Sequence, residues 1–139
     1  MTFEQIQSRL DVLKANLEKL DEIPQSSFEE FASDFRNIDA TLHILQTSIQ
    51  ALLDLGSYLV AQRALAVPQT SHEIFERLEE AGHLPAGTAT RMAPIVGFRN
   101  RVVHLYDRID YRRVFEILTQ HRDDLADSLD LLLAIVEEP

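Results

Sequence analysis

The sequence around residue 100 combines residue types suited to proton transfer beside a phosphate. Arg99, Asn100, His104 and Tyr106 lie within the segment RNRVVHLYD, residues 99–107. Histidine changes charge near neutral pH, so it can take a proton from an attacking hydroxyl or donate one to a leaving oxygen. Arginine carries a permanent charge that can stabilise negative charge growing on phosphorus. The segment therefore indicates phosphoryl-transfer chemistry. The alternative is that His104 has a structural role, in which it hydrogen-bonds a backbone carbonyl at a helix end.

The spacing of these residues limits how a single helix can use them. Asn100 and His104 are four apart and share a helix face, as do Arg99 and Tyr106, which are seven apart. Arg99 and His104 are five apart, which separates them by about 140° of rotation. They can act on one atom if the helix is distorted by Pro94 or at its end. They can also do so if two copies of the helix meet across a two-fold axis and share a cleft.

The charge of the chain is unevenly distributed. The formal charge is −10, yet residues 91–122 contain seven arginines and three acidic residues. A negative protein does not attract an anionic ligand by its overall charge, so this arginine-rich stretch is where such a ligand is expected. The alternative is that these arginines pair with acidic residues on neighbouring helices.

Other routes to catalysis have weaker support. The chain has no cysteine, which excludes disulfides, thiolate nucleophiles and cysteine-based zinc sites. The other histidines show no metal-ligand spacing, and there is no GxSxG sequence or glycine-rich phosphate loop. We therefore expect no metal and no cofactor. Asp39, near Arg36, is a candidate for orienting a basic group across the fold, and a surface role is the alternative.

The elements that must position these residues are all predicted to be helices. Apolar residues recur three and four apart along the chain, and no window shows sustained alternation of apolar and polar residues. The fold class is therefore all-α. The predicted helices cover residues 3–20, 27–65, 71–82, about 88–106, and 110–136.

Local signals support the predicted helix ends. Ser27 and Glu30 form a capping-box pattern, Ser71 and Asp110 are expected N-caps, and Gly82 is an expected left-handed C-cap. Within the predicted helices, Gly56 indicates either a bend or a close helix crossing, and Pro94 indicates a kink.

The apolar stripes predict an up-and-down bundle of four long helices plus a short one, in a single domain over residues 1–139. The second helix carries further apolar residues beside its main stripe, namely Ala51, Leu53, Leu55 and Leu59. They favour a homodimer, and the alternative explanation is a central helix that is buried within one chain. The N-terminal sequence does not resemble a signal peptide, and the longest apolar run, residues 131–136, is too short to span a bilayer. We expect a cytoplasmic protein that does not contact a membrane.

The segment RNRVVHLY resembles the signature of HEPN domains, in which an arginine and a polar residue precede a histidine by four to six positions. A tyrosine follows two residues after the histidine, and with it the segment resembles the HepT-like group of toxins in particular. The flanking segments extend the resemblance over nearly the full chain; they are LDLGSYLVAQ, VPQTSHEIFERLEEAGHLP and MAPIVGFRNRVVHLYDRIDYRRVFEIL.

The resemblance implies a HEPN-type helical homodimer in which the motifs of two subunits form one cleft. It implies a metal-independent ribonuclease acting on cellular RNA, with tRNA as the expected substrate, in a type VII toxin–antitoxin system. Arg99 and His104 would be the catalytic pair and Asn100 their polar support, and Tyr106 would receive AMP from a MntA-like nucleotidyltransferase antitoxin. Candidate RNA-binding residues are Arg101, Arg108 and Arg112.

Two alternatives to this function stay open. One is a non-catalytic HEPN module that docks a nucleotidyltransferase or a nucleotide. The other is a structural dimeric bundle, which a fully paired arginine-rich stretch would favour.

Overall fold

The computed structural model describes residues 2–104 and 106–138, and only the backbone of Tyr106. The predicted all-α class is confirmed, because every regular element in these residues is helical. The helices are α1 (Phe3–Leu20), α2 (Phe28–Ala32), α3 (Phe35–Gln62), α4 (Ser71–Glu80), α5 (Thr88–His104), α6 (Tyr111–Gln120) and α7 (Arg122–Val136), with a 3-10 turn η1 (Tyr106–Arg108). None of the described helices is long and apolar enough to cross a membrane.

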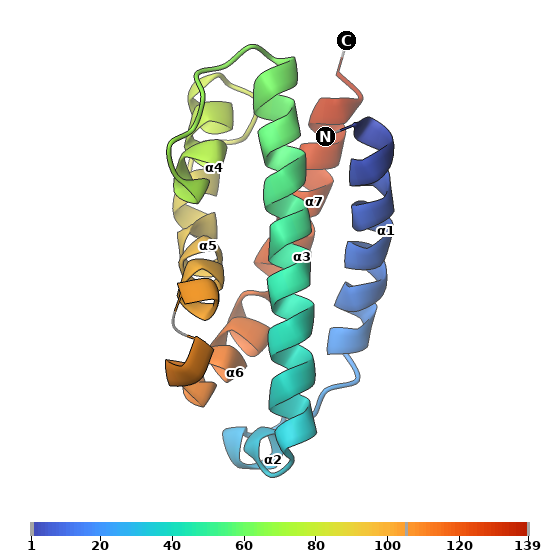
Figure 1. The fold of residues 1–139 in the computed structure, drawn as a ribbon, viewed down its shortest axis with the longest axis vertical. Coiled ribbons are helices and arrows are strands. Elements are labelled where there is room, and N and C mark those ends of the chain that lie inside the picture. Colours follow the sequence, from blue (N-terminus) through green and yellow to red (C-terminus); the bar gives the residue numbers. More distant parts are fainter. Residues whose placement is uncertain (1, 105, 139) are drawn as a thin grey trace.

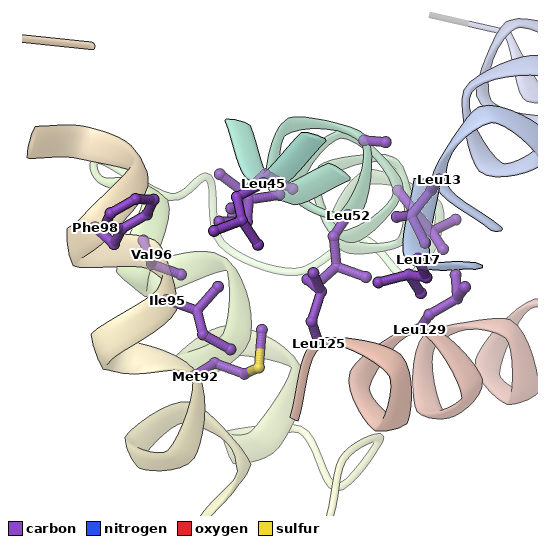
Figure 2. Packing of buried hydrophobic residues seen from close by; sticks show 14 of the residues in the cluster. Leu13, Leu17, Leu45, Leu52, Met92, Ile95, Val96, Phe98, Leu125 and Leu129 are labelled. Carbon is purple, nitrogen blue, oxygen red and sulfur yellow. The ribbon is translucent and has the colours of Figure 1, made fainter. Parts of the chain in front are cut away.

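Helix α3 is the centre of the bundle. It runs along the middle of the molecule, with α1 on one side and α4 and α5 on the other (Figure 1). Side chains of α1, α3, α5 and α7 meet in one hydrophobic core (Figure 2). The extra apolar residues of α3 are buried within the single chain; they are Ala51, Leu53, Leu55 and Leu59. A buried central helix thus accounts for them without a second subunit.

The prediction of one continuous helix over residues 27–65 is wrong, because the structure has two helices there, α2 and α3. Ser27 caps α2 as predicted, accepting a hydrogen bond from the Glu30 N–H at 3.1 Å. At Asp34 the backbone is extended, and its carboxylate accepts from the Arg36 N–H at 2.9 Å. An aspartate that bonds the backbone in this way begins a new helix, although the apolar pattern continues across the break. The second of the two helices also ends earlier than predicted, at Gln62.

The predicted helix over residues 110–136 is also two helices, α6 and α7. Asp110 caps α6 as predicted, accepting from the Arg112 N–H at 2.9 Å. His121 then leaves the helical conformation, with φ −120° and ψ 1°. The break lets α6 pack on α2 and α3 while α7 packs on α3 and α5. The described bundle therefore has four long helices and three shorter ones, not one shorter helix.

Helix α4 follows the prediction closely. Its N-cap is Thr70 and not Ser71, because the Thr70 hydroxyl accepts the hydrogen bond from the Glu73 N–H. After its C-terminus, Gly82 has φ +82°, the left-handed conformation predicted for this glycine.

Gly56 marks a close helix crossing, which was one of its two predicted roles. A Cβ added at this position would lie 2.6 Å from Ile74 Cγ2 on α4. That methyl group sits on a β-branched carbon and has little freedom to move away. The glycine therefore lets α4 approach the central helix.

We predict that Gly56→Ala lowers the free energy of unfolding by about 1–3 kcal/mol, because the new methyl group overpacks the α3–α4 contact. Urea denaturation measures the change. The loss should shrink when Ile74→Ala removes the clashing methyl group. Gly97→Ala is the matched control, since its added Cβ meets no described atom within 4 Å apart from the neighbouring backbone of its own helix. A Gly56→Ala variant as stable as the Gly97→Ala variant would contradict the crossing.

Candidate active site

Helix α5 carries most of the residues singled out from the sequence. Pro94 lies inside this helix, as predicted, and the described part of the helix extends to His104. The buried side chains on its inner face are Met92, Ile95, Val96, Phe98 and Val102. Val103, the apolar residue before His104, is 44% exposed. The helical period thus leaves the polar residues of the segment at the margin of the core and on the surface.

Arg99 lies half-buried where α5 packs against α3. Its Nη2 donates a hydrogen bond to Gln50 Oε1 on α3, and its Nη1 donates to Asn100 Oδ1 at 3.3 Å. Its Nε is buried without a hydrogen-bond partner among the described residues. No described carboxylate lies within 4.0 Å of it. The guanidinium is therefore held by neutral oxygens, and its positive charge stays available to an anion.

The hydrogen bonding continues from Arg99 across the surface of α3. Gln50 Nε2 donates to Asp54 Oδ1 at 2.9 Å, and Asp54 Oδ2 is paired with Arg9 of α1. Sequence reasoning missed Gln50 and Asp54, and their only signal was a spacing of four on one helix. They border a pocket of about 400 Å³ lined by Ser8, Arg9, Val12, Gln46, Thr47, Gln50, Ala51 and Asp54.

His104 is exposed at the C-terminal end of α5 and bonds no other described residue. Asn100 is half-buried, and its oxygen is used by Arg99. The structure thus brings Arg99 and Asn100 together but makes no bond between Arg99 and His104. Five residues of a helix separate these two by about 140° and by about 7.5 Å along the axis. On a regular helix the two side chains therefore leave the axis in different directions.

The arginine-rich stretch is only partly neutralised. Three of its arginines pair with carboxylates, in the pairs Arg91–Asp124, Arg113–Glu116 and Arg122–Asp21. Three further arginines are exposed and have no carboxylate within 4.0 Å among the described residues; they are Arg101, Arg108 and Arg112. Arg112 is held over the ring of Phe28, with its guanidinium carbon 4.2 Å from the ring centroid. Full pairing of the stretch, which would favour a structural bundle, is therefore not found in this part of the chain.

The two remaining predicted residues are not part of this arrangement. Asp39 is exposed on α3 and makes no hydrogen bond or ion pair with any described residue. Its neighbour Arg36 pairs instead with Asp34 at 2.8 Å and holds the pKa of that carboxyl below its usual range. The side chain of Tyr106 lies outside the described residues.

Comparisons with known proteins cover nearly the whole chain. The family model for HepT-like ribonucleases matches residues 13–132. The chain is 31% identical over 110 residues to the tRNA nuclease HepT of Aphanizomenon flos-aquae, covering 79% of this chain and 75% of that protein. It is 26% identical over 105 residues to the mRNA nuclease HepT of Shewanella oneidensis, covering 76% of this chain and 79% of that protein.

Solved structures share the fold. The tri-AMPylated HEPN toxin of Shewanella oneidensis in complex with MNT antitoxin matches with a TM-score of 0.81 at 22% identity, over 96% of this chain and 99% of that one. The cytosolic protein YutE of Bacillus subtilis matches with a TM-score of 0.82 at 17% identity, over 99% of this chain and 92% of that one. At these identities the likeness concerns the fold. With the family model matching most of its length, the chain belongs to the HepT-like ribonuclease family.

Proposed function

We propose that residues 1–139 form one HEPN-like domain that acts, as a homodimer, as the ribonuclease toxin of a type VII toxin–antitoxin system. The observation that carries the proposal is the charge of Arg99, which is half-buried and held only by neutral amide oxygens. Five residues beyond it, the exposed His104 supplies a group that exchanges protons near neutral pH. We take tRNA as the substrate, because the relative that is 31% identical is a tRNA nuclease.

The proposed cleavage is an internal transfer of the phosphoryl group. His104 removes the proton from a ribose 2′-hydroxyl, and the freed oxygen attacks the adjacent phosphorus. Arg99 stabilises the additional negative charge on the phosphate oxygens, while Asn100 keeps the guanidinium in place. The bond from phosphorus to the 5′ oxygen breaks, and the partner subunit's His104 gives that oxygen a proton. The products are a 2′,3′-cyclic phosphate and a 5′-hydroxyl, and no step requires a metal.

A second subunit completes this site in the proposal. Arg99 and His104 diverge on one helix, so a cleft between two copies of α5 is the simplest way to place both at one phosphate. Val103, exposed next to His104, supplies an apolar contact for such an interface. Arg101, Arg108 and Arg112 contact backbone phosphates of the RNA on either side of the scissile one.

Neutralisation is proposed to occur at Tyr106, through AMP transferred by a cognate MntA-like nucleotidyltransferase antitoxin. Support comes from the solved complex of an AMPylated HEPN toxin with MNT antitoxin. Tyr106 follows His104 by two residues and begins the turn η1. AMP at this position adds bulk and a negative phosphate beside the cleft, and so repels RNA by charge and by volume.

We predict that the purified protein cleaves total tRNA in EDTA and that His104→Ala lowers the rate by at least about 100-fold, because general acid–base catalysis contributes that much. A denaturing gel resolves the products. His43→Ala is the control, since His43 is an exposed histidine on α3. Full activity of the His104→Ala variant would contradict the proposal. If wild-type protein with unmodified Tyr106 cleaves nothing, the non-catalytic binding module becomes the better account.

We predict that Tyr106→Phe leaves cleavage intact but abolishes neutralisation by the antitoxin and ATP, because phenylalanine lacks the acceptor hydroxyl. Intact-mass spectrometry reports AMP addition, and the tRNA assay reports activity. Tyr111→Phe, which changes another nearby tyrosine, should still be modified and neutralised. Neutralisation of the Tyr106→Phe variant to the wild-type extent would show that AMP acts elsewhere.

We predict that Arg99→Met leaves the melting temperature unchanged or higher, because Arg99 gains no ion pair in return for its partial burial. Arg122→Met should instead lower the free energy of unfolding by about 1–3 kcal/mol. Arg122 bonds the Leu17 carbonyl at 3.1 Å and Asp21 at 3.0 Å, and so joins α7 to α1. Equal destabilisation by both changes would mean that Arg99 has a structural role.

A further inference from the structure

We propose that Gln50 and Asp54 are positioning residues that fix the direction of the Arg99 guanidinium from the surface of α3. The inference rests on the proposed function, since it takes Arg99 as the group that stabilises the transition state. It deepens that function by assigning two residues outside the RNRVVHLY segment to the site. Neither residue is proposed to touch the RNA.

The hydrogen bonds that link Arg99, Gln50 and Asp54 allow a single orientation of the Gln50 amide. Asp54 Oδ1 can only accept, so it requires the NH₂ end of the amide, which donates to it at 2.9 Å. The carbonyl end, Oε1, then faces Arg99 and accepts from Nη2. Without Asp54 the amide is free to turn over and present its NH₂ group to the guanidinium, which is itself only a donor.

Arg9 completes the arrangement from α1. It is 47% exposed and pairs with Asp54 Oδ2, while the Asp54 side chain is only 16% exposed. A bare carboxylate one amide group away from Arg99 would repel a phosphate bound there. The ion pair with Arg9 reduces that repulsion and leaves Oδ1 in place to hold Gln50.

The use of a neutral amide next to Arg99 has a chemical consequence. Two oxygens, from Gln50 and Asn100, hold the two ends of the guanidinium fork without cancelling its charge. A carboxylate in the place of Gln50 would fix the arginine equally well but would neutralise it. The side chain therefore enters the reaction already oriented and still positive, which is the condition for strong electrostatic stabilisation of a transition state.

The test compares Gln50→Leu with the matched control Gln46→Leu. Gln46 lies one turn earlier on α3, borders the same pocket and bonds no other described residue. We expect Gln50→Leu to lower kcat for tRNA cleavage by about 10- to 100-fold with little change in KM, as small misplacements of catalytic groups do. In an Arg99→Ala background, Gln50→Leu should have no further effect, because it acts through Arg99. Gln46→Leu should keep the wild-type kcat.

A second readout does not depend on activity. The Nε of Arg99 is buried, so its N–H should exchange slowly enough for its ¹⁵N–¹H resonance to be observed and assigned by Arg99→Lys. We expect this resonance to shift or broaden in Gln50→Leu and in Asp54→Ala, but not in Gln46→Leu. Circular dichroism melting curves confirm that each variant is folded.

Two results would overturn the inference. One is a wild-type kcat and an unchanged Arg99 resonance in Gln50→Leu. The other is a loss of kcat in the Arg99→Ala background as large as in the wild type, which would mean that Gln50 acts independently of Arg99. If Arg99→Ala itself keeps full activity, the proposed function fails instead, and the resonance alone then decides whether Gln50 and Asp54 orient Arg99.

Discussion

The uncompensated charge of Arg99 is the constraint on which the rest of the site depends. A half-buried guanidinium loses part of its hydration. Proteins usually compensate for this cost of desolvation with an ion pair. Arg122 shows the usual arrangement, since it bonds both Asp21 and a backbone carbonyl. Arg99 has only amide oxygens as partners in the described part of the chain. A charge kept in this condition binds an arriving phosphate more strongly than a paired one would.

The central helix makes this arrangement possible. One side of α3 is fixed in the core by Leu45, Ile49 and Leu52, and this packing holds Gln50 and Asp54 in register with their partners. Helices α1 and α5 lie on either side of α3 and supply the two arginines at the ends of the hydrogen-bonded chain (Figure 1). Hydrophobic packing thus determines the geometry of a polar site on the surface above it.

Features that depend on neighbouring residues, such as helices and their capped ends, are predicted from the sequence. Helix periodicity and capping residues gave the helices and several of their ends, including those at Ser27 and Asp110. The breaks at Asp34 and His121 were missed, because the apolar pattern continues through both. The sequence spacing of Arg99 and His104 was enough to predict that they lie on different faces of one helix. The contact from Arg99 to Gln50 joins residues 49 apart, so it follows from how α3 and α5 pack and has no signal in spacing.

The central claim is that one active site is built from Arg99 of one subunit and His104 of the other. Mixing inactive Arg99→Ala and His104→Ala proteins, with subunit exchange verified by native mass spectrometry, tests it most directly. In the mixed dimer one subunit supplies an intact Arg99 and the other an intact His104, while the second His104, which would protonate the leaving oxygen, is missing. The account therefore predicts tRNA cleavage below the wild-type rate but clearly above that of either variant alone. A mixed dimer as inactive as its two parents would contradict the shared site.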